Sequence, residues 1–210
     1  MSYFPFFIDL SDKSGLIIGG GMVAYRKVCA LIEFGAKLKI VASRYCDELK
    51  EYTQDNECVQ LYLRKFQEDD LENIDFCIAA TDDHELNRKI SQMCEKRHIL
   101  VNVVDVKELC GFIFPSYVKK NDVVVGVSSG GKSPLITQEI RKMIEESLPK
   151  DIGDCADFLG EVRQTVKEYV EGEANRKSCY KELMQCYINY KKRPDDIVVM
   201  EVIKKYECQK

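Results

Sequence analysis

The sequence predicts an α/β fold, a doubly wound parallel sheet that is followed by a β-rich region and then by a helical region. Three observations support this prediction. Short β-prone apolar runs alternate with helical patterns from residue 14 to residue 104, which is typical of parallel sheets with crossover helices. A glycine-rich turn directly follows the first of these runs. From Gly111 onward the alternation stops, and two adjacent β-prone runs precede a long helical stretch.

The glycine-rich turn has the spacing of a dinucleotide-binding fingerprint, Gly-x-Gly-x-x-Ala. It follows the apolar run Leu16–Ile18 and opens a helical pattern that Gly35 can end. Gly19 is expected to make the tight turn, Gly21 to let a pyrophosphate approach the backbone, and Ala24 to let the helix pack against the strand. The candidate cofactor-binding turn comprises Gly19, Gly20, Gly21, Met22, Val23 and Ala24.

A short glycine motif also fits a βα connection that binds nothing. Its place at the end of the first strand in a series of βα units favours a Rossmann-type nucleotide site. The N-terminus of the following helix offers free N–H groups and a partial positive charge, both of which suit a pyrophosphate.

The choice between NAD and NADP depends on the end of the second strand. An acidic residue that holds the ribose hydroxyls is expected about 20 positions after the glycines. The strand Lys37–Ala42 ends instead in Ser43 and Arg44. Ser43 can bond a ribose hydroxyl, whereas Arg44 suits a 2′-phosphate. The residues alone therefore leave both cofactors open, and both side chains are candidate cofactor contacts.

The other elements follow from the periodicity of the apolar residues. The expected strands are Tyr3–Leu10, Leu16–Ile18, Lys37–Ala42, Cys58–Leu63, Asp75–Asp83 and Ile99–Val104. The expected helices between them are the one that opens at the glycine turn, Tyr45–Thr53, and a stretch with Leu86, Ile90, Met93 and Cys94 on one face.

Polar side chains follow the fourth and fifth strands of this series at their carboxyl ends, where doubly wound sheets bind ligands. The candidates there are Thr81, Asp82, Asp83, Asn102, Val103 and Asp105. Asp and Asn also supply turns and helix caps, so this composition alone does not decide between binding and local structure.

The β-rich region reads as a hairpin of Phe112–Val118 and Asp122–Ser128, joined by Lys119, Lys120 and Asn121. A helix to about Ser147 follows, with Ser133 as N-cap and Pro134 as first residue. The loop before it can form an anion-binding nest or an ordinary capped loop. Its candidate binding residues are Ser129, Gly130, Gly131 and Lys132.

The C-terminal region is helical by pattern, with a joint at Glu171–Arg176 and a third element from about Asp195 to Tyr206. One apolar stripe consists of Ile152, Ala156, Leu159, Val162, Val166 and Tyr169. A second consists of Cys179, Leu183, Met184 and Tyr187.

The composition, with 45% hydrophobic and 31% charged residues among 210, is that of an ordinary globular protein. No apolar run reaches the length of a membrane span, and the N-terminus lacks the basic region of a signal peptide. The net charge of −4 argues against general nucleic-acid binding. We expect neither membrane nor nucleic acid as a partner.

The ten cysteines are scattered and form no Cys-x-x-Cys pair. Most of them fall at apolar positions of the strand and helix patterns, where a thiol acts as a small hydrophobic group. We therefore expect reduced cysteines and a cytoplasmic protein. They are Cys29, Cys46, Cys58, Cys77, Cys94, Cys110, Cys155, Cys179, Cys186 and Cys208.

Six blocks, in this order, resemble the precorrin-2 dehydrogenase family, whose members often also act as sirohydrochlorin ferrochelatases in siroheme synthesis. The blocks are Phe6–Leu10, Gly19–Ala24 with Arg26 and Lys27, Ala79–Asp83 with Asn87, Asn102–Asp105, Phe112–Ser116 and Val127–Pro134. The last 60 or so residues are similar to the family only as a helical tail, and the methyltransferase domain of its trifunctional members is absent from this sequence.

The resemblance implies a Rossmann domain for NAD at residues 1–112, a dimerisation region at 113–148 and a C-terminal helical region at 149–210. It also implies a homodimer with precorrin-2, a reduced tetrapyrrole rich in carboxylates, as substrate. Asp105 would be the acid–base residue, and Ser129–Lys132 would face the tetrapyrrole. The basic side chains near that loop are Lys119, Lys120, Lys132, Arg141 and Lys142.

The resemblance leaves chelation open. If the protein is bifunctional, Fe²⁺ would be a substrate of the second step, and Asp105 would be the residue that serves the metal. The only histidines are His84 and His98, and neither is placed as half of a ligand pair. The sequence does not decide between Fe²⁺ and Co²⁺.

Two other classes of function fit the first half of the chain. One is a regulatory module that senses a dinucleotide without catalysis, and the other is a structural dimer with a vestigial nucleotide site. The sensing module gives no reason for the carboxylate of Asp105 at the end of the fifth strand, beside a second β region.

Overall fold

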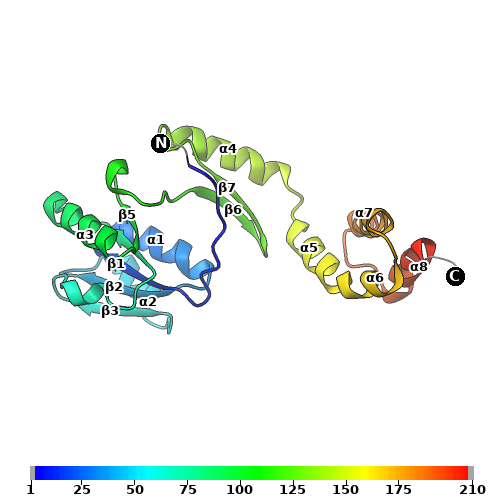
Figure 1. The fold of residues 1–210 in the computed structure, drawn as a ribbon, viewed down its shortest axis with the longest axis horizontal. Coiled ribbons are helices and arrows are strands. Elements are labelled where there is room, and N and C mark those ends of the chain that lie inside the picture. The colour runs from blue at the N-terminus through cyan, green and yellow to red at the C-terminus, as the bar shows by residue number, and fades with distance from the viewer. Residues whose placement is uncertain (1–2, 208–210) are drawn as a thin grey trace. The chain divides into compact units, whose positions relative to one another are not determined.

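The computed structural model describes residues 3–207 (Figure 1). The chain divides between Phe114 and Pro115 into two compact units, and each is described by itself. Cys208 lies outside the described residues, as do the first two residues of the chain. Within residues 3–207, no helix is both long and apolar enough to cross a membrane.

The first unit is built on a five-stranded sheet in the order β3-β2-β1-β4-β5, and all of its strand pairs are parallel. The strands are β1 (Ser14–Ile18), β2 (Lys37–Ala42), β3 (Val59–Leu63), β4 (Phe76–Ala79) and β5 (Leu100–Val103). The doubly wound parallel sheet predicted from the sequence is therefore confirmed.

Helices cover both faces of this sheet (Figure 1). They are α1 (Met22–Glu33), α2 (Asp47–Thr53) and α3 (His84–Lys96), with short 3₁₀ turns η1 (Glu68–Leu71) and η2 (Lys107–Leu109). Successive side chains of a strand point to opposite faces, so Ile17 of β1 packs in the core under α1. Its neighbours Leu16 and Ile18 pack in the core under α3. Every β1 residue from Leu16 onward is therefore buried.

The strand expected at Tyr3–Leu10 is wrong. This segment is irregular and pairs with no strand among the described residues. The side chains of Phe4, Phe6 and Phe7 are 75–79% exposed. β-propensity reflects packing on a half-buried pleated surface, and this segment has no such surface beneath it. Pro5 also lacks the N–H group that a ladder requires.

The second unit begins with the antiparallel hairpin of β6 (Ser116–Lys120) and β7 (Val123–Val127). The hairpin was predicted, but its limits differ. Lys119 and Lys120 belong to β6 rather than to the turn, which instead uses Asn121 at φ 50°. Asn tolerates this left-handed backbone better than Lys does. The strand also begins after Pro115, which cannot donate to a ladder.

Helix α4 (Pro134–Ser147) packs on this hairpin. The Ser133 hydroxyl accepts a hydrogen bond from the Ile136 N–H at 3.3 Å, which confirms the predicted N-cap. Four further helices form a separate core. They are α5 (Ile152–Glu161), α6 (Arg163–Tyr169), α7 (Glu173–Tyr190) and α8 (Asp196–Tyr206).

The first apolar stripe of this helical core is partly wrong. Cys155 and Phe158 face the core, whereas Tyr169 is 44% exposed. The buried residues Cys155 and Phe158 each precede an expected stripe residue by one position, and the chain breaks between α5 and α6 at Val162. The second stripe is confirmed by the burial of Cys179, Leu183 and Tyr187, against which Met184 packs.

The described cysteines are all free thiols. Cys77 and Cys94 lie in the sheet core under α3, and Cys155 and Cys179 lie in the helical core. These four act as small apolar residues, as the sequence pattern predicts.

Ile78 lies on the interior strand β4, with β1 on one side and β5 on the other, and is fully buried. We expect Ile78→Ala to lower the free energy of unfolding by about 2–5 kcal/mol, because it removes buried methyl groups and leaves a cavity. The matched control is Leu63→Ala on edge strand β3, where the side chain is 70% exposed. Urea denaturation followed by circular dichroism measures both, and equal effects of the two substitutions would contradict this account of the core.

Candidate functional site

The carboxyl ends of four strands bring the candidate cofactor residues to one edge of the sheet. β1 lies between β2 and β4, so the chain reverses its winding direction between β1 and β4. Doubly wound sheets bind ligands outside the carboxyl ends of their strands at such a reversal. Gly19 and Thr81 follow the two strands on either side of it.

Gly19 and Gly20 are required by close backbone contacts. Gly19 has φ +121°, and a Cβ there would lie 2.1 Å from the Ala80 carbonyl oxygen. A Cβ on Gly20 would lie 2.1 Å from the Arg44 carbonyl oxygen. Gly20 also accepts a hydrogen bond from the Cys46 N–H at 2.8 Å. These two glycines hold the turn against the ends of β4 and β2.

Gly21 has a different role, because a Cβ there would meet nothing within 4 Å. It is the N-cap of α1, with no side-chain cap and no acidic residue in the first helical turn. The first helical hydrogen bond runs from the Tyr25 N–H to the Gly21 carbonyl. Hence the N–H groups of the preceding helical residues have no partner within the helix. Open space beside free N–H groups fits a pyrophosphate.

Ser43 and Arg44 directly follow β2 and are exposed. The Arg44 backbone touches the glycine turn through Gly20, so its side chain projects from the same edge of the sheet. Where many dinucleotide sites have an acidic residue after the second strand, this edge has Ser43 and Arg44.

Thr81 and Asp83 organise the end of β4. The Thr81 hydroxyl donates to Asn87 Oδ1 at 2.6 Å, and the Asn87 amide donates back to the Thr81 carbonyl at 2.9 Å. Asp83 caps α3 by accepting from the Leu86 N–H at 3.0 Å. Asp82, between them, is exposed. Thr81 and Asp83 therefore have local structural roles at the edge where they were expected to meet the cofactor.

Asn102 and Cys110 fasten the segment that follows β5. The buried Asn102 amide donates to the Phe112 carbonyl at 3.0 Å. The Cys110 thiol accepts from the Val103 N–H at 3.2 Å. It also lies 3.2 Å from the Val103 carbonyl and 3.3 Å from the Val106 carbonyl. The thiol therefore binds the backbone on both sides of Val104 and Asp105.

Asp105 projects from this fastened segment. Its side chain is exposed, and its backbone adopts the left-handed conformation at φ 62°. Asp tolerates this conformation better than most residues. Non-glycine residues in such regions of backbone space often mark functional sites. The carboxylate is thus displayed just beyond β5, at the carboxyl edge of the sheet.

Lys27 belongs to one of the six sequence blocks, but the sequence does not single it out as a candidate site residue. It lies on α1, half-buried, with its ammonium 3.7 Å from the centroid of the Phe114 ring. Burial lowers the pKa of this ammonium to about 8, while nearby Cys110 and Asp105 act in the opposite direction. The sequence signal that could have indicated its partial burial is its position next to the apolar stripe Ala24, Val28 and Leu31.

The loop between β7 and α4 holds the other predicted binding residues, Ser129 to Lys132. Gly130 and Gly131 have positive φ angles of 63° and 78°, a backbone conformation that glycine adopts readily. Hydrogen bonds within the loop already occupy part of its backbone, since the Lys132 N–H donates to the Ser129 carbonyl at 3.3 Å. The Lys132 side chain is exposed.

Two of the basic residues expected beside this loop are paired along α4. Arg141 is 2.5 Å from Glu145, and Lys142 is 3.0 Å from Glu139. These exposed pairs reduce the positive charge that α4 offers to an anion. Lys132 therefore remains the strongest single candidate for an anion contact in this unit.

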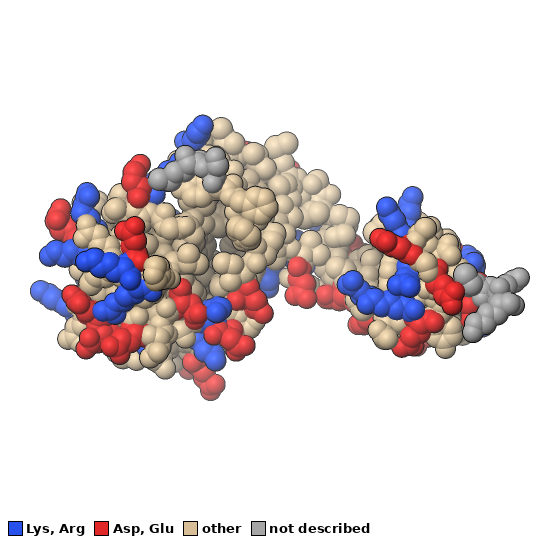
Figure 2. Space-filling view, in the orientation of Figure 1, with Lys and Arg blue, Asp and Glu red and all other residues tan. Residues whose placement is uncertain are grey.

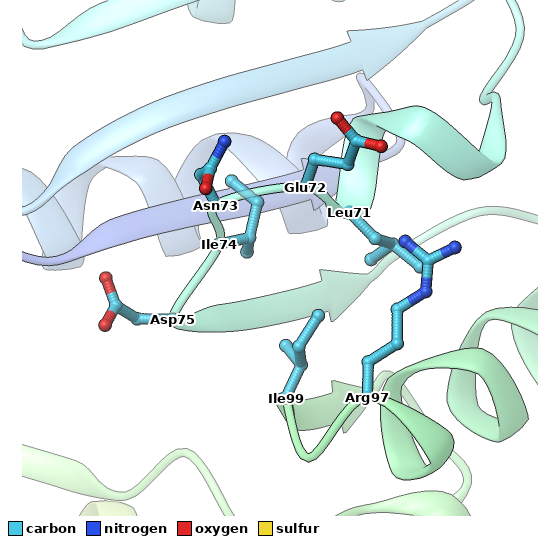
Figure 3. Close-up of a pocket in the computed structure, with 7 residues that line it drawn as sticks. All are labelled: Leu71, Glu72, Asn73, Ile74, Asp75, Arg97 and Ile99. Atoms are coloured by element: carbon cyan, nitrogen blue, oxygen red, sulfur yellow. The ribbon is translucent and has the colours of Figure 1, made fainter.

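An open hollow of about 580 Å³ lies at the opposite edge of the first unit's sheet. Figure 3 shows that Asp75 precedes β4 there and that Ile99 precedes β5. Asp75 accepts hydrogen bonds from the Ser14 N–H and the Lys13 ammonium, so it closes the start of the sheet. These are the amino ends of the strands, away from the edge where ligands bind.

Among residues 3–207, no group of three or more His, Cys, Asp or Glu side chains is placed to hold a metal ion. The expectation that Asp105 serves a metal therefore rests on a single carboxylate. In the described part of the chain, no further ligands are gathered around it.

The fold and the carboxyl edge together define a Rossmann-type dinucleotide-binding protein. Residues 6–116 match the protein family described as "Putative NAD(P)-binding". This match covers more than half of the chain, and the chain belongs to this NAD(P)-binding family. The first unit is therefore its NAD(P)-binding domain.

Several relatives extend the similarity beyond this domain. A siroheme synthase of Photorhabdus laumondii is 40% identical over 182 residues, which make up 87% of this chain and 38% of that protein. A siroheme synthase of Nitrosospira multiformis is 40% identical over 188 residues, covering 88% of this chain and 40% of that protein. The chain thus spans about two fifths of the length of these relatives. The resemblance inferred from the six sequence blocks is confirmed as a relationship to siroheme synthases.

A solved structure named "SirC, precorrin-2 dehydrogenase" has the same fold. Its TM-score is 0.73 at 24% identity, and the match covers 97% of this chain and 100% of that one. The predicted succession of a Rossmann-type sheet, an antiparallel strand pair and C-terminal helices is confirmed by this likeness.

Gly21 gives a sharp test of the cofactor edge. We expect Gly21→Asp to abolish NAD⁺ binding, because a carboxylate would occupy the pyrophosphate position and repel it. The fold should survive, since Gly21 has the ordinary φ of −86° and an empty space for a side chain, and Asp is a good N-cap. Isothermal titration calorimetry measures the binding, and thermal denaturation checks the fold.

The matched control is Gly21→Asn, which has nearly the same size but no charge and should weaken binding less. Near wild-type NAD⁺ affinity in Gly21→Asp would mean that the glycine loop is only a turn.

Proposed function

We propose that the protein is an NAD-dependent precorrin-2 dehydrogenase that forms sirohydrochlorin in siroheme synthesis. The observation that carries this proposal is the Asp105 carboxylate, held in a left-handed backbone conformation at the edge where the glycine turn lies. A protein that only senses a dinucleotide has no use for a displayed proton acceptor there. The similarity of most of the chain to siroheme synthases supports the same substrate class.

Each residue at the edge has a task in this proposal. NAD⁺, when bound, supplies the acceptor for the hydride that leaves precorrin-2. The glycine turn and the first N–H groups of α1 bind the pyrophosphate. Asp105 accepts a proton that the tetrapyrrole loses as it is oxidised, and the backbone clamp of Cys110 and Asn102 fixes the position from which it does so.

The finer assignments belong to the same proposal. We assign NAD rather than NADP, with Ser43 bonding a ribose hydroxyl, on the basis of the family resemblance. Ser129–Lys132 would bind carboxylates of the tetrapyrrole. We extend the proposal to a second reaction, the insertion of Fe²⁺ into sirohydrochlorin at Asp105. The similarity to siroheme synthases supports this second reaction. A cytoplasmic location fits the free thiols of the described cysteines.

Asp105→Asn tests the role of the carboxylate. Asn also tolerates the left-handed backbone, so the segment keeps its shape while the proton acceptor is lost. A positioned general base contributes about 10²–10⁴-fold to rate. We expect turnover of precorrin-2 with NAD⁺ to fall by at least about 100-fold, while NAD⁺ affinity stays nearly unchanged. Sirohydrochlorin absorbance under anaerobic conditions measures the rate.

The matched control is Glu108→Gln, which removes an exposed carboxylate from the same segment and should leave turnover unchanged. Wild-type turnover in Asp105→Asn would remove this carboxylate from the mechanism. Loss of NAD⁺ binding in that variant would instead make Asp105 a cofactor or structural residue.

We also propose that the protein is a homodimer formed through the second unit. Its hairpin is a two-stranded sheet of its own that packs against α4, and Val123, Val124 and Val125 of β7 remain only half-buried. Along α4, Ile136, Ile140 and Met143 form one stripe with exposed fractions of 55%, 40% and 67%. Figure 2 shows few charges over the visible face of this region. An exposed apolar helix stripe beside half-buried strand valines fits a second copy of the chain.

Met143→Glu would place a charge on the most exposed residue of this stripe, so we expect it to shift the protein from dimer to monomer in sedimentation velocity. Gln138→Glu on the same helix, exposed and outside the stripe, is the control and should remain dimeric. A wild-type protein that sediments as a stable monomer at micromolar concentration would refute the dimer.

A further inference from the structure

The segment that precedes β1 leaves a run of large apolar side chains uncovered. Phe4, Phe6 and Phe7 are 75–79% exposed, and Ile8 is 57% exposed. The centroids of the Phe4 and Phe6 rings lie 5.0 Å apart, so these two side chains form one patch. Contiguous apolar surface of this kind usually marks a place of interaction. We call residues 4–8 the aromatic arm.

The backbone of the aromatic arm is as bare as its side chains. Among the residues that the structure describes, none forms a backbone hydrogen bond with residues 4–8. Figure 1 accordingly draws the arm as an irregular trace before β1. Unpaired N–H and carbonyl groups in a β-prone segment are a template for pairing with another strand.

The chain on either side of the aromatic arm is anchored to the first unit. Leu10 packs against the core that lies under α1. At the other end, the Lys107 ammonium lies 5.6 Å from the centroid of the Tyr3 ring. The arm is therefore presented between two fixed points, and less conformational entropy is lost when it binds a partner than for a free tail.

The hairpin of the second unit has a strand edge that suits such an arm. Within residues 3–207, β6 and β7 pair only with each other, so each has a free edge. β6 carries Lys119 and Lys120, and lysines on an edge strand discourage further pairing. β7 has no charged residue, and its first three valines are only half-buried. The free edge of β7 is thus the one open to another strand.

We propose that the aromatic arm of one copy adds as a third strand to the free edge of β7 in a second copy, and that the two copies exchange arms in this way. This inference rests on the proposed homodimer and extends its interface. Strand addition pairs the backbone of the arm and covers its rings. Two equivalent exchanges close the dimer with twofold symmetry.

Pro5 fits the position of an outer strand. Proline has no N–H group, so within a sheet it is confined to an edge strand, with that position facing solvent. Because successive residues of a strand direct their N–H groups to opposite edges, an outward Pro5 makes Phe4, Phe6 and Ile8 face β7. The sequence of the arm therefore supplies three inward donors and places its missing donor on the outside.

The area of the arm is sufficient for a stable interface. A buried aromatic side chain covers about 150–250 Å², so the exposed parts of the three phenylalanines offer roughly 450 Å² in each copy. Two arms and the surfaces that they cover would bury roughly 1,800 Å² in total. Stable interfaces bury about 1,200–2,000 Å². The residues of the arm and of β7 are uncharged, so no charge is buried.

Hydrogen exchange tests the arm in the wild-type protein. We expect the Phe4, Phe6 and Ile8 amides to be protected where the protein is dimeric and to exchange freely once dilution makes it monomeric. The Phe7 amide should exchange fast in both states, because its N–H faces solvent. Mass spectrometry with electron-transfer fragmentation resolves these amides. A dimer in which Phe4, Phe6 and Ile8 exchange as fast as a free peptide would overturn the proposal.

Two matched proline substitutions test the direction of the arm. Phe6→Pro and Phe7→Pro each remove one exposed phenyl ring and one N–H group, but only the first group points to β7. We expect the dimer Kd from sedimentation equilibrium to rise at least about tenfold more in Phe6→Pro, because each copy loses an inter-strand hydrogen bond. NAD⁺ affinity should stay unchanged in both. Equal effects on the dimer would contradict strand addition.

Mixing two defective chains tests whether the arm binds a second copy. Phe6→Pro damages the arm, and Val124→Lys places a charge on β7, as natural edge strands do. Each variant alone should dimerise weakly. A mixed dimer keeps one sound arm on one sound β7, so we expect it to form at lower concentration than either parent, as measured by sedimentation of a fluorescently tagged chain. No gain on mixing would show that the arm does not bind the partner's β7.

The outcomes separate this inference from the earlier proposals. A wild type that stays monomeric contradicts the homodimer and the arm exchange together. A dimer that survives with a freely exchanging arm contradicts the exchange alone. A dimer with protected arms that does not oxidise precorrin-2 supports the exchange and contradicts the proposed function. Should Val124→Lys fail to fold, hydrogen exchange and the two proline variants still decide the question.

Discussion

The close backbone contact between the glycine turn and its two neighbouring loops is the constraint on which this structure depends. Gly19 touches Ala80 after β4, and Gly20 touches Arg44 after β2. No side chain fits at either place, so the two glycines draw the carboxyl ends of three strands together. That contact leaves Gly21 at an open position and the first turn of α1 uncovered. The proposed phosphate site is the space that remains after the backbone has packed.

A second arrangement builds on the same edge. Asn102 and Cys110 hold the segment after β5 through its backbone, and the result is a carboxylate displayed on a strained but tolerated residue. Functional side chains commonly lie on loops that a rigid sheet positions. Here the sheet positions the loop through one amide and one thiol. Lys27, on the same helix α1 as the proposed phosphate site, lies half-buried with its ammonium 3.7 Å from the centre of the Phe114 ring.

The sheet, its helices and the glycine turn could be predicted because each depends on a short local pattern. These patterns are the spacing of apolar residues and a run of small residues. Tyr3–Leu10 was mistaken for a strand because β-propensity does not say whether a partner strand exists. The stripe of α5 was misplaced by one residue because adjacent apolar residues, such as Phe158 and Leu159, fit the helical period almost equally well. Cys110 and Lys27 were missed for a related reason. Their roles arise from contacts with Val103, Val106 and Phe114, and sequence spacing does not show such contacts.

The most direct test of the central claim is the reaction itself. Purified protein is incubated anaerobically with precorrin-2, with and without NAD⁺, and NADH and sirohydrochlorin are followed together by absorbance. The account predicts that both products appear in equal amounts and only when NAD⁺ is present. Tight NAD⁺ binding with no sirohydrochlorin formed would contradict it and leave a dinucleotide-sensing module as the better explanation of the fold.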